Sequence, residues 1–114
     1  MKTLAIAHLR DIRLGVSIAR HLEAIDATLA PFGGRFPVHR APVEPVEGAF
    51  DADVVITAFP DHEAARRWYD SPAYQQILPL RTDSARCDAF FVDTFDERHR
   101  APDLLPALFG ETVP

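Results

Sequence analysis

The sequence predicts an α+β fold in which strands and helices follow the order β-α-β-β-α-β. Three observations predict it: apolar runs typical of strands lie at residues 3–9, 53–59 and 89–95, segments with helical spacing of apolar residues separate them, and a proline-rich stretch lies between the first helix and the second of these runs. The chain has 114 residues, of which 47% are hydrophobic and 25% charged. Such a chain forms one ordinary globular domain with a single core.

The first half of the chain predicts a central strand followed by a long helix. "TLAIAHL" (3–9) is apolar on both of its alternating faces, which is typical of a strand with neighbours on both sides. From about Gly15 the apolar residues recur at spacings of three and four, and they are Ile18, Leu22, Ile25 and Leu29. We expect this helix to end at "PFGG", where Gly33 or Gly34 can take the left-handed conformation.

The second half predicts two more strands with a broken helix between them. "RFPVH" and "PVEPVEG" together predict one interrupted edge strand, because proline cannot donate a ladder hydrogen bond in a central position. "DVVITAF" (53–59) predicts a buried strand, and Asp61 then caps a helix. A second helix begins at Ser71-Pro72, and "AFFVDTF" (89–95) is the last strand.

This order is the split βαβ arrangement of a ferredoxin-like domain with an antiparallel sheet, whose helices cover one face only. The alternation leaves open whether Ala5, Ala7 and Leu9 or their alternates lie on the uncovered face. In either case that face is apolar over several strands. We therefore expect a second copy of the chain to cover it, which gives a homodimeric α/β barrel.

Composition excludes several partners and cofactors. A net charge of -5 without a basic stripe argues against nucleic acid, and no segment reaches the length of a membrane span. Cys87 is the single cysteine, so we expect no disulfide and a cytoplasmic location. The histidines show no metal-ligand spacing, and Gly33-Gly34 is not a phosphate loop, so we predict neither a metal site nor a cofactor.

Residues 96–114 form a C-terminal tail after the domain of residues 1–95. The tail is charged at its start and contains two prolines, which is typical of a frayed end. Its apolar residues allow an alternative, a short helix that docks over a groove or on the partner subunit. These residues are Leu104, Leu105, Leu108 and Phe109.

One segment resembles a known family. "FPDHEAARRWYDSPAYQQI" followed by Arg81, together with "IAHL", "FGGRF" and "VEPVEG", resembles the domain of unknown function 1330 family of the dimeric α/β-barrel superfamily, over about residues 3–95. The resemblance implies a dimer with a cavity between sheet and helices. Related proteins include cofactor-free monooxygenases and isomerases. In this chain "RDIRLGVS" replaces the usual start of the first helix, and Pro79 falls inside the last helix, where it can displace Arg81.

Arg81 is the strongest candidate for binding a ligand. Tyr74, Ile77, Leu78 and Arg81 occur at i, i+3, i+4 and i+7, so a helix that continues past Pro79 places the guanidinium at the end of an aromatic stripe. A guanidinium backed by rings binds a carboxylate or phosphate. In the alternative, Trp68, Tyr69 and Tyr74 are core residues and Arg81 pairs with a carboxylate such as Asp88.

Two further candidates come from the strands. His8 lies on the central strand among apolar neighbours, where an imidazole can act as acid, base or ligand contact, or can instead be a neutral histidine bonded to a backbone carbonyl. Arg35, in "GGRF", can reach the same cleft or pair with a carboxylate near Glu44 or Glu47.

The leading prediction is a small-molecule-binding domain for a small, partly apolar organic acid. Its pocket lies between helices and sheet, and the predicted lining residues are His8, Arg35, Trp68, Tyr69, Tyr74 and Arg81. One alternative is a cofactor-independent isomerase, cyclase or monooxygenase acting on a specialised metabolite, with His8 as proton shuttle. The other is a structural or regulatory homodimer without a ligand.

Overall fold

The sheet has four antiparallel strands. The computed structural model describes residues 2–110. The strands are β1 (Thr3–Arg10), β2 (Arg35–His39), β3 (Asp53–Phe59) and β4 (Arg86–Asp93). They lie in the order β2-β3-β1-β4, so β1 is central and β2 is an edge strand, as predicted. The chain has the α+β, ferredoxin-like arrangement that the element order predicts.

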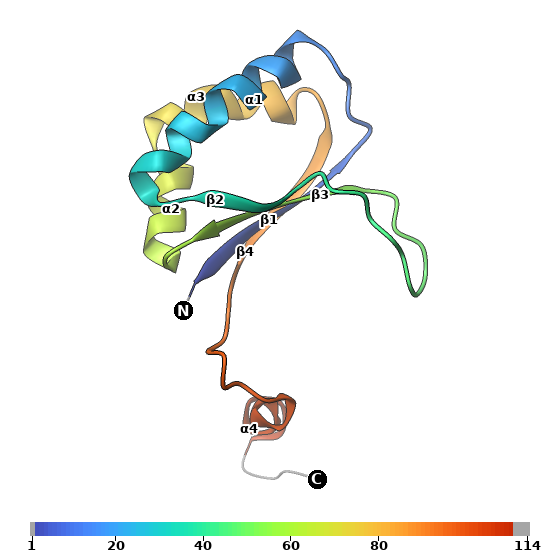
Figure 1. The fold of residues 1–114 in the computed structure, drawn as a ribbon, viewed down its shortest axis with the longest axis vertical. Helices are drawn as coiled ribbons and strands as arrows, with labels where there is room; N and C mark the ends of the chain where they lie inside the picture. Colours follow the sequence, from blue (N-terminus) through green and yellow to red (C-terminus); the bar gives the residue numbers. More distant parts are fainter. Residues whose placement is uncertain (1, 111–114) are drawn as a thin grey trace.

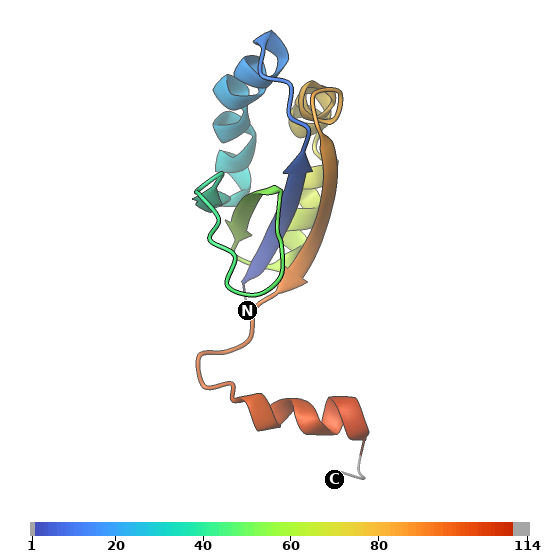
Figure 2. The same cartoon turned by 90° about the vertical axis from the view of Figure 1, so that its right-hand side faces the viewer.

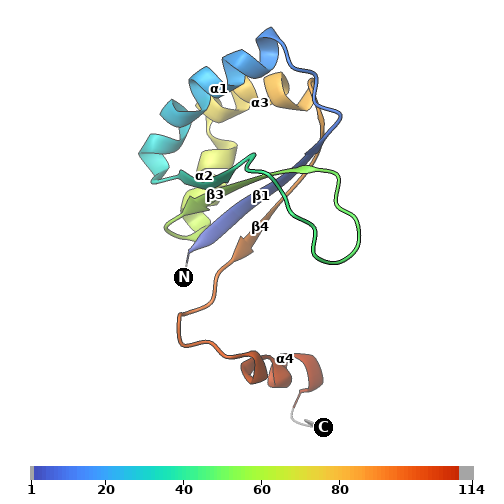
Figure 3. The same ribbon diagram turned by 45° about the vertical axis from the view of Figure 1, so that its right-hand side comes forward.

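Three helices cover one side of this sheet (Figure 1, Figure 3). They are α1 (Val16–Leu29), α2 (His62–Asp70) and α3 (Pro72–Thr82). The break between α2 and α3 is set by caps, because the Asp61 carboxylate accepts a hydrogen bond from the Ala64 N–H at 2.8 Å and the Ser71 hydroxyl accepts one from the Tyr74 N–H at 3.3 Å. Both predicted caps are therefore confirmed.

Helix α3 continues past Pro79 as far as Thr82. A proline in a helix interior removes one backbone hydrogen bond. The hydrogen bonds that follow are nevertheless made, since the N–H of Asp83 donates to the Pro79 carbonyl oxygen at 2.9 Å. Arg81 therefore stays on the same helix as Tyr74, seven residues away.

The predicted edge strand is only half correct. "RFPVH" is β2, but residues 42–48 form a loop without strand pairing. Arg40 has a positive φ of 56° and its N–H donates to the Val54 carbonyl oxygen at 3.0 Å, which ends the ladder. The prolines that follow cannot donate to β3, so the chain leaves the sheet. The last strand begins at Arg86, three residues before the predicted start, and ends at Asp93.

The well-packed core lies at one end of the helical layer, where α1 joins β2. A short 3-10 helix, η1 (Ala30–Phe32), leads into Gly33, which has a left-handed φ of 69°. Gly34 allows close packing, because a Cβ atom there would lie 2.7 Å from the Leu29 side chain and 2.8 Å from that of Phe59. The buried core cluster consists of Ile25, Leu29, Phe59, Ala65, Trp68 and Tyr74.

The strand register decides which residues face the helices. Ala5 pairs with Thr57 and Phe91, and these residues face the helical layer with Ala7 and Leu9. The alternate residues therefore form the open face, and they include Leu4, Ile6, His8, Val54, Ile56, Phe90 and Val92. Phe90 is 47% and Val92 44% exposed. The sequence left the choice of face open, and the structure resolves it.

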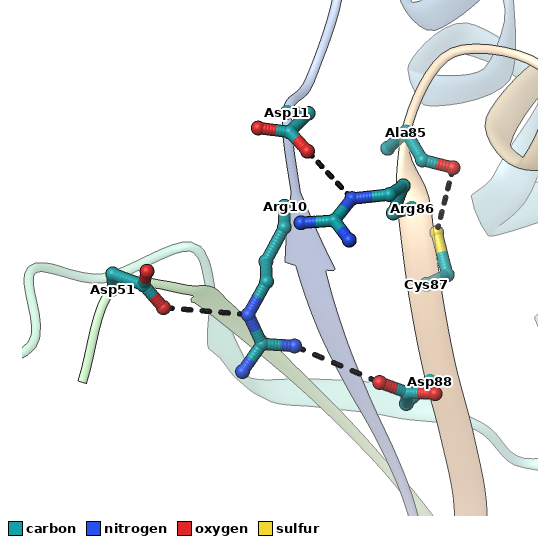
Figure 4. A network of polar contacts seen from close by, with 7 residues as sticks. All are labelled: Arg10, Asp11, Asp51, Ala85, Arg86, Cys87 and Asp88. Atoms are coloured by element: carbon teal, nitrogen blue, oxygen red, sulfur yellow. Dashed lines mark hydrogen bonds and ion pairs between the residues drawn. The ribbon is translucent and has the colours of Figure 1, made fainter.

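A charged cluster borders the open face at the end of β1 (Figure 4). Arg10 contacts the carboxylates of Asp51 at 3.3 Å and Asp88 at 3.6 Å, and Arg86 pairs with Asp11. All these side chains lie within reach of solvent, so each ion pair contributes little to stability. The cluster marks the point where the apolar part of the open face ends.

The C-terminal segment leads away from the domain (Figure 1, Figure 2). It contains the 3-10 helix η2 (Ala101–Leu104) and the short helix α4 (Leu105–Phe109). Leu108 is 71% exposed, so α4 does not cover a groove of its own domain. Docking on a partner subunit stays a prediction. Residues 1 and 111–114 of the predicted domain and tail lie outside the described residues, and within 2–110 no helix is long and apolar enough to span a bilayer.

Candidate anion-binding cavity

A cavity of about 360 Å³ lies between the sheet and the helices. Small and apolar side chains of the strands form its floor, namely Ala5, Ala7, Val55, Thr57, Ala89 and Phe91. Helix α1 closes it on the opposite side with Ile18, His21, Leu22 and Ile25. The alanines leave space that larger side chains would fill, so the layer is hollow here while it is close-packed at Leu29 and Phe59.

Three aromatic rings form one wall. The centroids of Trp68 and Tyr74 are 3.9 Å apart, and those of Tyr69 and Tyr74 are 5.5 Å apart. The indole N–H of Trp68 donates to the Thr28 hydroxyl at 3.1 Å, and Thr28 in turn donates to the Ile25 carbonyl oxygen at 2.7 Å. The rings are therefore part of the core and also line the cavity, so the two interpretations offered by the sequence are compatible.

Arg81 enters the cavity from α3. Its Nη2 donates to the Tyr74 hydroxyl at 3.2 Å, whereas its Nη1 is buried without a hydrogen-bond partner among the described residues. Burial disfavours the charged guanidinium, but Tyr74 and the neighbouring Cys87 favour it, and the net effect raises the pKa of Arg81 above its usual value. The carboxylate that the sequence offered as its partner, Asp88, contacts Arg10 instead.

The charge around the cavity is positive. No Asp or Glu among the described residues lines it, although the chain as a whole carries a net charge of -5. Arg40 and Arg66 also line it, but each pairs with a carboxylate at 3.0 Å. Within residues 2–110, Arg81 is thus the lining arginine without an ion pair. A half-buried cation with a fully buried Nη1 and no counter-ion makes the cavity complementary to an anion.

His21 also lines the cavity and is not among the site residues predicted from the sequence. Its ring is buried, and its Nε2 has no hydrogen-bond partner among the described residues. Burial, with smaller contributions from Arg81 and His39, lowers the pKa of His21 from 6.5 to about 4. A signal existed: His21 is three residues after Ile18 and four before Ile25, on the apolar face of the helix.

The structure separates two of the predicted site residues from the others. Trp68, Tyr69, Tyr74 and Arg81 come together at the cavity, but neither His8 nor Arg35 lines it. His8 lies on the open face, between the rings of Phe50 at 5.3 Å and Phe90 at 6.0 Å. Arg35 is exposed and pairs with Ala58, whose side chain also belongs to the open face. The expectation that both enter the cavity is corrected, because successive strand residues point to opposite faces.

The titratable groups of the cavity do not form a metal centre. Among residues 2–110 no group of three or more His, Cys, Asp and Glu side chains could hold a metal ion. His21 and His39 are the lining residues with imidazole nitrogens, and Arg40, Arg66 and Arg81 also line the cavity. The arrangement is suited to binding an anion rather than a cation.

The sequence of the chain matches one family model. The model described as Domain of unknown function (DUF1330) matches residues 2–95. The chain belongs to this family. The match contains the whole sheet and α1, α2 and α3, and therefore every residue of the cavity, whereas the segment with η2 and α4 lies beyond it. No curated protein matches the sequence.

Solved structures show the same fold at low sequence identity. A protein of unknown function from Rhodopseudomonas palustris is 13% identical with a TM-score of 0.57, and 83% of each chain is covered. A dimeric ferredoxin-like protein of unknown function from Jannaschia sp. CCS1 is 15% identical with a TM-score of 0.58, covering 82% of this chain and all (100%) of that one. SnoaB, a cofactor-independent oxygenase from Streptomyces nogalater, is 14% identical with a TM-score of 0.56, covering 87% and 98%. These structures thus share the fold of this chain, and the one from Jannaschia sp. CCS1 is described as ferredoxin-like.

Proposed function

We propose that the protein binds a small, partly apolar organic anion in the cavity between helices and sheet. The observation that carries the proposal is the buried Nη1 of Arg81, which has no hydrogen-bond partner among the described residues in a cavity that no described carboxylate lines. A buried donor without a partner costs about 1–3 kcal/mol, and more when it is charged. An anionic ligand would remove this cost.

The shape of the cavity suits a ligand with two different ends. The acidic head accepts hydrogen bonds from Arg81, and the apolar body lies on the rings of Trp68 and Tyr74 above the alanine floor. A volume of about 360 Å³ is at the lower end of the range for small-molecule sites. The alternative of a dimer without any ligand predicts a filled interior here, and the cavity therefore favours a ligand.

Benzoate is a suitable probe because Trp68 is the only tryptophan and lies in the cavity wall. We expect benzoate to change the Trp68 fluorescence in a saturable manner, and the neutral benzamide to bind more weakly. Arg81→Gln should weaken benzoate binding about tenfold or more, since a charge-assisted hydrogen bond is lost. Arg67→Gln is the matched control, because Arg67 lies on α2 outside the cavity and pairs with Glu63.

Equal binding of benzoate to the wild type and to a folded Arg81→Gln variant would contradict the proposal. Circular dichroism and urea unfolding establish that each variant is folded. If benzamide binds as tightly as benzoate, the cavity takes apolar ligands without selecting for charge. That result would remove the anion from the proposal.

Turnover of the bound anion is the second candidate function. The observation that favours it is the Nε2 of His21, which has no hydrogen-bond partner among the described residues and lies in the cavity. It can serve as an acid or base in place of His8, which lies on the open face. The fold is also that of SnoaB, a cofactor-independent oxygenase. Activity on any substrate that disappears in His21→Gln and persists in His8→Gln would support this function. Activity that depends on His8 alone would contradict it.

We also propose that two copies of the chain form a homodimer through the open face. A cytoplasmic location is proposed because a single cysteine suits a reducing compartment. Phe50, Phe90 and Val92 expose 36%, 47% and 44% of their surfaces there, and fold relatives from two other organisms are described as dimeric. Sedimentation should show a dimer at micromolar concentration, and Phe90→Arg should shift it toward the monomer. A well-folded wild-type monomer would contradict the proposed dimer without affecting the cavity.

A further inference from the structure

We propose that His21 is the second polar contact of the anion held by Arg81, and that it takes up a proton when the anion binds. This inference rests on the proposed function of the cavity. It adds a residue that lies on a different helix from Arg81, and it adds a regulation, because binding would then strengthen as the pH falls.

The geometry points to His21 because of what its ring lacks. Only two buried side-chain nitrogen or oxygen atoms among the described residues have no hydrogen-bond partner, and they are Nε2 of His21 and Nη1 of Arg81. Both residues line the same cavity, one from α1 and one from α3. Buried polar groups are normally satisfied, so two exceptions that share one cavity indicate that a ligand completes both.

The groups that face His21 explain why it is neutral without a ligand. Helix α3 contributes Arg81 and the uncharged Tyr74, β2 contributes His39, and Arg40 follows directly after β2. Helix α2 contributes Arg66 and Tyr69, whereas β1, β3 and β4 add no charged side chain to the lining. Cys87 lies next to Arg81 and its thiol donates to the Ala85 carbonyl oxygen. Burial is the largest cause that lowers the pKa of His21 to about 4, and the charges of Arg81 and His39 lower it further.

An anion bound at Arg81 reverses this balance. Its negative charge offsets the guanidinium and lies next to the imidazole, so the pKa of His21 rises on binding. Linkage then requires that affinity rises as the pH falls, over the interval between the pKa of the complex and that of the free protein near 4. Above that interval His21 is neutral in both states, and affinity no longer depends on it. At most one proton is taken up.

Benzenesulfonate is the probe for this proposal because its own charge does not change in the relevant pH range. We expect wild-type protein to bind it at least about threefold more tightly near pH 5 than near pH 7.5, with uptake of a fraction of one proton. Isothermal titration calorimetry in two buffers of different ionisation enthalpy measures that uptake directly. In His21→Phe, which keeps a ring of similar size, the pH dependence and the uptake should disappear, whereas His62→Gln, outside the cavity, should keep both.

Proton-detected NMR of the histidine rings separates failure of this inference from failure of the proposed function. In ligand-free Arg81→Gln the pKa of His21 should rise toward 6.5, because the second cause of its depression is removed. A wild type that binds benzenesulfonate with no proton uptake, or an uptake that persists in His21→Phe, overturns the inference and leaves anion binding intact. If no anion binds to the folded protein at any pH, the proposed function fails, and the inference fails with it.

Discussion

The helical layer is close-packed at one end and encloses a cavity at the other, although the same helices form both ends. At one end Leu29 of α1 is 2% and Phe59 of β3 is 1% exposed, and Gly34 brings the backbone into contact with both. At the other end the first turns of α1 and the last turns of α3 lie over alanines, and the space between them stays hollow. Close packing and the cavity therefore lie toward opposite ends of the helical layer, and Trp68 and Tyr74 contribute to both. Substitutions at each end should therefore affect different measurements.

The largest effect is expected from truncating a leucine at the packed end. Leu29→Ala should lower the free energy of unfolding by about 2–5 kcal/mol, because it leaves a void that the surrounding side chains can fill only in part. Leu22→Ala on the same helix is the matched control, and since Leu22 is already 45% exposed its cost should stay under about 1 kcal/mol. Urea unfolding of both variants measures the difference. Equal costs would contradict the division of the layer into a packed and a hollow end.

The sequence predicted the features that depend on a few neighbouring residues. The caps at Asp61 and Ser71 and the seven-residue spacing that links Tyr74 to Arg81 each depend on one or two helical turns. Such local signals need no knowledge of the rest of the fold. Helix α3 also continues past Pro79. Tyr74 in the core, with Ile77 and Leu78 packed against it, holds the helix against the rest of the domain.

The features that depend on distant residues were not predictable in the same way. Residues 3–9 are apolar on both faces, so alternation cannot tell whether His8 or Ala7 lies under the helices, and that choice is made by pairing with β3 and β4. Arg35 was selected for its place in "GGRF", although it alternates with the apolar Phe36 and Val38 and so lies on the face opposite to Phe36. His21 was missed because a polar residue on an apolar helix face was judged by its metal-ligand spacing alone, and its cavity exists only when α3 is packed beside α1.

A second effect is expected at the hollow end from pH alone, and it changes the free energy of unfolding by about 2 kcal/mol at most. His21 has a pKa of about 4 when folded and an ordinary value of 6.5 when unfolded. The unfolded chain therefore binds more protons between these values, and the stability that a neutral His21 allows is fully present above pH 6.5 and is lost as the pH falls toward 4. Because the ring faces an open cavity, solvent screening reduces the energy below the full linkage value.

Urea unfolding of the wild type and of His21→Phe at a series of pH values measures this contribution. The two curves should run parallel above pH 6.5, and the wild type should lose more stability than the variant as the pH falls from there toward 4. Other titrating groups affect both proteins equally. Parallel curves over the whole range would show that the pKa of His21 is not lowered in the folded protein. That result would also remove the basis for its proton uptake when a ligand binds.

The smallest effect is expected where the two ends are joined. Ser71 caps α3, whose first turn packs in the core through Tyr74 and whose last turn carries Arg81 into the cavity. Ser71→Ala should lower the free energy of unfolding by about 1 kcal/mol, while Ser71→Asp, which keeps a capping oxygen, should restore most of it. Benzoate affinity should change by less than about twofold in both variants, because the packing of Tyr74 in the core still holds the helix in place. A twofold change corresponds to about 0.4 kcal/mol of binding free energy. A Ser71→Ala protein that is nearly as stable as the wild type but no longer binds benzoate would show that the cap positions Arg81 directly, and that the packed end does not fix the geometry of the hollow one.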